Sequence, residues 1–229
     1  MSTRLIIFDC DGTLVDGQHA ICAAMEHAFT TLDLPVPSRS DILSVVGLSL
    51  PETFAVLAAG HSVSVQGALA EFYRSDFPGK RQHPALYDPV YPGMAEVVTA
   101  LARRRDTLLG IATGKSRRGV ARLLEREGWQ DHFATIQTAD DNPSKPHPSM
   151  IFCAMAEAGV EPASTLMIGD TTYDIEMALD ARVGAIGVGW GYHDPERLGR
   201  AGAHAVVATP DDLVAVIDAR LAAQEEGST

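Results

Sequence analysis

The chain has 229 residues, of which 46% are hydrophobic and 21% are charged, and its formal net charge is −12. This size and composition suit a globular protein built as one large domain, or as a core with a smaller insert. The excess of negative charge argues against nucleic acid or an anionic membrane as a partner. It leaves a small anionic substrate open, because a bound cation and a few local positive groups can reverse the field in one cleft.

Cysteine usage and the N-terminal segment bear on the compartment. Cys10, Cys22 and Cys153 form no Cys-x-x-Cys pair, which predicts reduced thiols. The apolar run that starts at Leu5 is interrupted by Asp9, so it is too short for a signal peptide or a membrane span. No other segment approaches span length. We therefore expect a cytoplasmic protein.

The first predicted element is a strand at Leu5–Phe8, a continuous apolar run of the kind that is buried on both faces of a parallel sheet. Helical patterns without a strand candidate follow it. They cover Ile21–Leu32, Asp41–Val46, Pro51–Ala59 and Val65–Arg74. This stretch predicts an all-helical insert over residues 16–85, with hinge linkers at Asp16–Gly17 and near Arg81–Pro84.

Strands and helices alternate in the rest of the chain. The predicted strands are Thr107–Ala112, Thr165–Ile168, Val183–Val188 and, more weakly, His204–Val207. The predicted helices are Met94–Arg104, Arg118–Glu127, Pro148–Ala158, Asp174–Ala181 and Pro210–Ala222. This alternation predicts right-handed β-α-β units, and hence an α/β fold with a doubly wound, mainly parallel, Rossmann-like sheet. Residues 1–15 and 86–229 would form this core.

Two carboxylates follow the first strand in the run Asp9-Cys10-Asp11-Gly12-Thr13. Each candidate catalytic group of the chain follows a predicted strand end, where open α/β sheets bind ligands. A turn at Gly12 would point both carboxylates into one crevice, where their repulsion calls for a cation. Mg²⁺ is the usual cation where phosphate is also a ligand, and the second carboxylate can act as general acid and base. The alternative is an Asx-turn that ends the strand.

Two further segments carry groups suited to an anion. Thr113-Gly114 follows a predicted strand, and a hydroxyl with free turn amides makes a phosphate cradle. Lys145 lies in a loop with a proline on either side, Asn142–Pro148, whose stiffness suits an ammonium aimed at a fixed anion. An ordinary turn and a solvated loop lysine are the respective alternatives.

A second pair of carboxylates lies in the run Gly169–Asp174, directly after a predicted strand. Asp170 and Asp174 are about one helical turn apart at a helix start, where the helix dipole favours negative charge. They could complete the cation site. Helix capping by Asp170 or Thr171 is the alternative.

In order, spacing and strand context, these four segments resemble the haloacid dehalogenase-like hydrolase superfamily. The matching pattern is DxDGT, a strand-end Thr-Gly, Lys-Pro and GDxxxD. The resemblance covers essentially the whole chain, including a helical cap inserted after the first motif. The residues within the motifs are most similar to those of phosphoglycolate phosphatases. It implies a Mg²⁺-dependent phosphatase that hydrolyses a small phosphorylated metabolite, a phosphate monoester, through an aspartyl-phosphate.

The resemblance also implies individual roles at the metal. Asp9 would be the nucleophile and a Mg²⁺ ligand. Asp11 would protonate the leaving alcohol and then activate water, while its backbone carbonyl contacts the metal. Asp170 would be a ligand, and Asp174 would bind Mg²⁺ directly or orient a bound water.

Substrate contacts are implied in the same way. Thr113, Gly114 and Lys145 would bind the phosphoryl group, with Lys145 also paired with Asp9. The insert would select the substrate, with a specificity loop at Gly47-Leu48-Ser49. The candidates for binding a second anionic group are Arg74, Arg81, His19 and His83.

Several alternatives are weighed against the phosphatase. The second carboxylate, Asp11, argues against dehalogenases, which attack carbon. Phosphonate-cleaving relatives use a cap lysine, whereas the insert has none before Lys80. A non-catalytic phosphate-binding protein should have lost one of the motif residues. A β-phosphoglucomutase-like sugar-phosphate mutase stays open, as do a nucleotide, a sugar phosphate or pyrophosphate as substrate, and a monomer or a homodimer.

Overall fold

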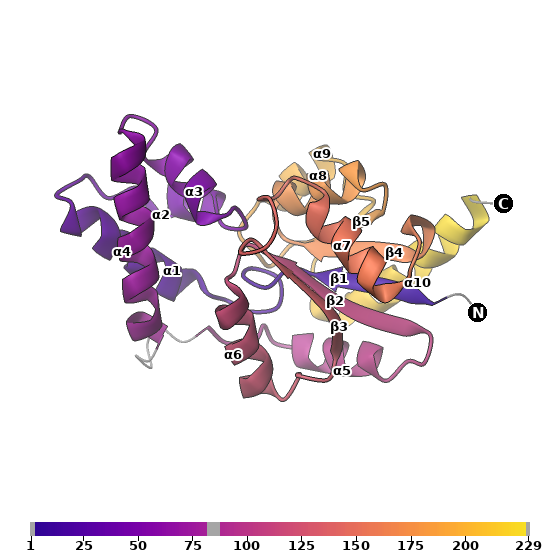
Figure 1. Cartoon of the computed structure of the whole chain (residues 1–229). Helices are drawn as coiled ribbons and strands as arrows, with labels where there is room; N and C mark the ends of the chain where they lie inside the picture. The colour runs from indigo at the N-terminus through magenta and orange to yellow at the C-terminus, as the bar shows by residue number, and fades with distance from the viewer. Residues whose placement is uncertain (1–2, 82–87, 228–229) are drawn as a thin grey trace.

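The computed structural model describes residues 3–81 and 88–227, and Figure 1 shows a group of helices beside an α/β core. The core is built on a six-stranded sheet with the order β3-β2-β1-β4-β5-β6, in which every neighbouring pair is parallel. The strands are β1 (Arg4–Phe8), β2 (Thr107–Thr113), β3 (Phe133–Thr138), β4 (Thr165–Gly169), β5 (Gly184–Val188) and β6 (Ala205–Val207). This sheet confirms the predicted fold class.

Helices cover both faces of the sheet, so the central strands are apolar throughout. In β1, Ile6 and Phe8 face one helical layer, while Leu5 and Ile7 face the other. The first layer consists of α5 (Met94–Ala102), α6 (Arg117–Glu127) and α10 (Pro210–Gly227). The second consists of α7 (Ser149–Ala158), α8 (Thr172–Asp180) and α9 (Pro195–Arg200). A short 3-10 turn, η2 (Pro162–Ser164), precedes β4.

Among the residues that the structure describes between β1 and α5, four helices form the predicted insertion (Figure 1). They are α1 (Gln18–Thr31), α2 (Arg39–Ser44), α3 (Leu50–Leu57) and α4 (Val63–Arg81). They enclose a hydrophobic cluster of their own, in which the rings of Phe29 and Phe54 lie 6.1 Å apart. The division of the chain at residues 16 and 85 stays a prediction, since 82–87 lie outside the described residues. His83 and Pro84 fall in that segment.

The two chain segments that join the insertion to the core lie side by side. Val15 and Val90 form an isolated antiparallel bridge. The amide of Asp16 donates a hydrogen bond to the carbonyl of Pro89, with the nitrogen and oxygen 2.8 Å apart. The insertion therefore leaves and rejoins the core at one place.

Besides the short turn η2, one strand and one helix of the core were not predicted from the sequence. β3 is an edge strand in which exposed or half-buried residues interrupt the buried ones, so its apolar run is weak. α9 is a six-residue helix that starts after the N-cap Asp194. The predicted elements otherwise agree with the structure, apart from shifts at their ends. Within the described part of the chain, no helix has both the length and the apolarity needed to cross a membrane.

Candidate active site

The chemically important side chains lie where β1, β2 and β4 end. Asp9 directly follows β1 and Asp170 directly follows β4. The amide of Asp9 donates to the carbonyl of Ile168 at 2.9 Å, which fixes the two strand ends beside each other. Thr113 is the last residue of β2. Parallel strands thus deliver groups far apart in sequence to one edge of the sheet.

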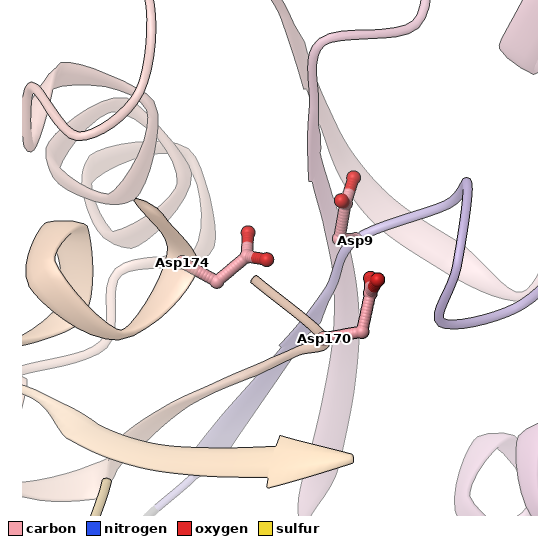
Figure 2. A group of neighbouring side chains, drawn as sticks. All are labelled: Asp9, Asp170 and Asp174. Carbon is pink, nitrogen blue, oxygen red and sulfur yellow. The ribbon is translucent and has the colours of Figure 1, made fainter. Parts of the chain in front are cut away.

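Asp9, Asp170 and Asp174 form a compact carboxylate cluster. One oxygen from each lies within 4.8 Å of the others, and all three side chains are buried. Figure 2 shows Asp9 and Asp170 rising from neighbouring strand ends, with Asp174 pointing toward them from the start of α8. Asp9 of the first motif therefore meets Asp170 and Asp174 of the fourth at one point.

Asp170 is held by donors from two segments. Its Oδ1 accepts from the Thr13 hydroxyl at 2.9 Å, and its Oδ2 accepts from the Tyr192 amide at 2.8 Å. Gly12 makes room for this carboxylate: its φ is 92°, and a Cβ there would lie 2.1 Å from Asp170 Oδ2. Gly12 thus permits the turn after Asp11 and also leaves the space that the carboxylate of Asp170 occupies.

Gly12→Ala is therefore expected to disturb the site and the fold together. A side chain at this φ costs about 1–3 kcal/mol, and it would also displace Asp170. Thermal melting should show the lost stability. A Mg²⁺ titration of activity should show weaker metal binding, as a higher Mg²⁺ concentration needed for half-maximal activity. Gly60→Ala is the matched control, because a Cβ at Gly60 meets nothing within 4 Å. A Gly12→Ala protein as stable and as active as the wild type would contradict this account.

Lys145 is buried against two members of the cluster. Its Nζ lies 2.6 Å from Asp174 Oδ1 and 3.1 Å from Asp9 Oδ1. The other oxygen of Asp174 accepts from the amide of Thr171 at 3.1 Å, as part of a capping box that starts α8. The capping alternative is thus correct for Thr171, which is the N-cap, and wrong for Asp170. Asp174 completes the capping box, and its carboxylate also faces the cluster. Capping and membership of the cluster do not exclude each other.

Burial dominates the electrostatics of the cluster. Desolvation raises the pKa of Asp9 to about 6, although the ammonium of Lys145 opposes the shift. Burial, together with the charges of Asp174 and Asp9, raises the pKa of Asp170 well above its usual value. Burial opposes the charge of Lys145, but Asp174 and Asp9 outweigh it and raise the pKa of that ammonium. The raised pKa values of Asp9 and Asp170 therefore indicate that Lys145 alone does not balance the negative charge of the cluster.

The cluster fits a divalent cation. Three ionised carboxylates and one ammonium leave two formal negative charges. Asp9 Oδ2 is buried and has no hydrogen-bond partner among the described residues, which is costly for a carboxylate oxygen unless a ligand completes it. The donors are all oxygens, the ligands that Mg²⁺ prefers. Asp11 is not in the three-residue cluster, so its expected metal contact, through the backbone carbonyl, stays a prediction.

The two turns predicted to bind substrate pack against each other, and both line the cavity described below. A Cβ on Gly114 would lie 2.7 Å from the carbonyl oxygen of Gly47 and 2.8 Å from that of Leu48. Thr113, beside Gly114, is buried at the end of β2. Only a glycine permits this close approach between the insertion and the core. The structure thus brings Gly47, Thr113 and Gly114 together.

A cavity of about 550 Å³ lies between the insertion and the core. The core lines it with Asp9, Asp11 and Thr113. The insertion contributes apolar side chains to its wall, among them Ile21 and Val46. The carboxylates therefore lie at one end of a cavity large enough for a small organic substrate.

The sequence candidates for binding a second anion have different outcomes. Arg74 lines the cavity and also pairs with Glu71. His19 is exposed and does not line the cavity. The side chain of Arg81 and the whole of His83 lie outside the described residues. Other lining side chains had not been singled out from the sequence: Lys115, Arg118 and Arg122.

Lys115 and Tyr192 are the main site residues that sequence reasoning missed. Lys115 Nζ lies 2.5 Å from Asp11 Oδ1, and its side chain is only 3% exposed. Its place directly after Thr113-Gly114, at a strand end, was an available signal. Tyr192 acts through its amide on Asp170, a contact that residue type does not reveal.

Comparison with known proteins places this geometry in a family. The family model for haloacid dehalogenase-like hydrolases matches residues 6–188. A probable phosphatase, IndB, from Dickeya dadantii is 36% identical over 95% of this chain and 94% of its own length. A pyrophosphatase, PpaX, from Oceanobacillus iheyensis is 30% identical over 95% of this chain and 98% of its own. A phosphoglycolate phosphatase from Chromobacterium violaceum is 32% identical over 86% and 89%, respectively.

A solved structure agrees with these sequence matches. The crystal structure of a predicted phosphatase from Clostridium acetobutylicum superposes with a TM-score of 0.82 at 26% identity. It covers 93% of this chain, and this chain covers 97% of it. The similarity therefore includes both the sheet and the inserted helices. The chain belongs to the haloacid dehalogenase-like hydrolase family, among its phosphatases.

Proposed function

We propose that this protein is a Mg²⁺-dependent phosphatase that hydrolyses a small, phosphoglycolate-like phosphate monoester through an aspartyl-phosphate on Asp9. The observation that carries the proposal is the state of Asp9. Its Oδ2 is buried without a hydrogen-bond partner among the described residues, while its Oδ1 lies 3.1 Å from Lys145 Nζ. Asp9 also lines the cavity. An oxygen in this setting is available to a phosphorus atom.

In the first half of the reaction, Asp9 attacks phosphorus and the bond to the ester oxygen breaks. Asp11 gives its proton to the departing alcohol. Lys145 offsets charge on Asp9 and on the phosphoryl oxygens, which Thr113 and the turn amide of Gly114 help to hold. Mg²⁺, held by the carboxylate cluster, would supply the remaining charge neutralisation that lets one anion approach another.

In the second half, water hydrolyses the aspartyl-phosphate. Asp11, now ionised, takes a proton from the water that attacks phosphorus, and the bond to Asp9 breaks. The carboxylate of Asp9 is restored and inorganic phosphate leaves. The helices within residues 16–85 would act as a cap that limits access of other water, because they form one wall of the cavity.

The cavity supports a substrate with a second negative charge. Arg118 and Arg122 line it from α6, and Arg74 lines it from α4. Phosphoglycolate carries a carboxylate that these guanidinium groups can bind, and the relative from Chromobacterium violaceum is named for that substrate. Pyrophosphate, the substrate class named for the relative from Oceanobacillus iheyensis, also offers a second anion.

A panel of phosphate esters tests the proposal. Phosphate release should be measured from phosphoglycolate, sugar phosphates, nucleotides and pyrophosphate, with Mg²⁺ and with EDTA. We expect release that depends on Mg²⁺, with phosphoglycolate among the preferred substrates. Silence across the panel would contradict a phosphatase, and isomerisation of a sugar phosphate would favour a mutase instead.

Arg118→Met tests the second-anion contact. We expect the KM for phosphoglycolate to rise about tenfold, since a hydrogen bond to a charged group contributes about 1.5–3 kcal/mol. The KM for p-nitrophenyl phosphate, which has no second anion, should stay within about twofold. Arg117→Met is the matched control, because Arg117 is on the same helix as Arg118 but pairs with Asp141, 2.6 Å away, outside that helix. Equal changes for both esters would count against the contact.

A further inference from the structure

Asp11 lies where both linkers of the cap meet the core. On the first linker, a Cβ at Gly17 would lie only 2.6 Å from Asp11 Oδ1. On the second linker, Asp88 is buried and follows the segment outside the described residues. The two linkers are bridged to each other at Val15 and Val90. Asp11 therefore lies beside the two chain segments that join the cap to the core.

Lys115 connects Asp11 to the second linker. Its Nζ lies 2.5 Å from Asp11 Oδ1 and 3.5 Å from Asp88 Oδ2, with only 3% of its side chain exposed. Asp88 is itself held by Arg126 of α6, which contacts its carboxylate at 3.0 Å and its carbonyl at 2.9 Å. The chain of contacts runs from α6 through Asp88 and Lys115 to Asp11.

We propose that Lys115 is a positioning residue for Asp11: its ammonium, anchored by Asp88, fixes the Asp11 carboxyl at the place of the leaving oxygen. This inference rests on the proposed function, in which Asp11 exchanges the proton. A proton donor works only within hydrogen-bond reach of the oxygen it serves. The contact supplies that constraint in both halves of the reaction, because the ammonium of Lys115 can donate to Oδ1 whether the other oxygen of Asp11 carries a proton or not. A hydrogen bond from a charged donor is shorter and stronger than one between neutral groups.

A direct contact with the phosphoryl group is the competing role for Lys115, since its side chain also lines the cavity. The two roles differ in their dependence on the leaving group. p-Nitrophenolate departs as a stable anion and needs little help from an acid. The alkoxide of benzyl phosphate, an ester of similar size, departs only with a proton. A phosphoryl contact serves both esters, whereas a positioned acid serves chiefly the second.

The experiment measures kcat/KM for p-nitrophenyl phosphate and for benzyl phosphate. For each ester, kcat/KM reports the transfer of the phosphoryl group to Asp9 and does not depend on the later hydrolysis of the aspartyl-phosphate. For Lys115→Met we expect a loss of about 10–100-fold with benzyl phosphate, part of the 10²–10⁴-fold that general acids contribute. The loss with p-nitrophenyl phosphate should stay within about threefold. Asp11→Asn should show the same asymmetry, and Asp88→Asn a smaller one. Arg117→Met should leave both ratios unchanged.

The outcomes separate this inference from the function on which it rests. Equal losses with both esters in Lys115→Met, or no asymmetry in either Lys115→Met or Asp88→Asn, would overturn the positioning role. So would a matching asymmetry in Arg117→Met, which would trace the effect to the start of α6. A wild-type protein inactive on both esters would overturn the proposed phosphatase, and this inference with it. Thermal melting shows whether each variant folds. If Lys115→Met does not fold, Asp88→Asn still carries the test.

Discussion

Replacing Asp9 with asparagine is expected to lower kcat for phosphate release by at least about 10⁴-fold, the scale on which loss of a covalent nucleophile acts. An amide oxygen is a poor nucleophile and carries no negative charge. The substitution nearly preserves shape, and Lys145 keeps its 2.6 Å contact with Asp174. The loss should therefore appear in turnover with little change in folding. Steady-state phosphate release, with thermal melting alongside, measures both.

Asp140→Asn is the matched control for this prediction. Asp140 also lines the cavity, but its carboxylate accepts a hydrogen bond from the amide of Arg117, 2.8 Å away, at the start of α6. The proposed mechanism gives it no proton or phosphoryl group to transfer. Its turnover should stay within about threefold of wild type. An Asp9→Asn enzyme that turned over at a similar level would remove Asp9 from the role of nucleophile.

Lys145→Met is the second change with a large expected effect, because it acts on both stability and chemistry. The buried ammonium contacts Asp9 and Asp174, and removing it leaves both carboxylates without their cation. Breaking a buried pair in this way costs about 3–5 kcal/mol. Loss of charge stabilisation at the phosphoryl group should lower kcat by about 10³-fold. Denaturant unfolding and phosphate release measure the two effects.

Mg²⁺ offers a sharper test of the same variant. A cation bound by the cluster would partly replace the missing positive charge, and a ligand that binds the folded state stabilises it. Added Mg²⁺ should therefore raise the melting temperature of Lys145→Met more than that of wild type. Arg200→Met is the control, since Arg200 forms an exposed pair with Glu196. A Lys145→Met protein with wild-type stability and no added response to Mg²⁺ would contradict the charge balance described for the cluster.

The fold was predictable where the sequence pattern and the burial coincide. Strands covered on both faces, such as Leu5–Phe8, appear as continuous apolar runs between turn residues. The helical insertion was recognisable because it lacks such runs. The edge strand β3 was not, because it is the outermost strand of the described sheet and residues such as Ala134 are exposed. Edge strands carry a weaker apolar signal than central ones.

The candidate site was predictable to the extent that its residues follow strand ends. Asp9 and Asp170 could be placed together because parallel strands finish at one edge of the sheet. Their partners could not be placed in this way. Lys115 reaches Asp11 across 104 residues of sequence, and Tyr192 contacts Asp170 through its backbone. Such pairings depend on tertiary packing, which local residue patterns do not predict.

The most direct test of the central claim is chemical trapping of the proposed aspartyl-phosphate. The protein would be mixed with its best substrate and Mg²⁺, quenched with borohydride, digested, and analysed by mass spectrometry, since reduction converts an aspartyl-phosphate to homoserine. We expect homoserine at Asp9, dependent on substrate and on Mg²⁺, while Asp11 stays unmodified. An active enzyme that gave no reduced residue, or gave one at a position other than Asp9, would contradict the mechanism.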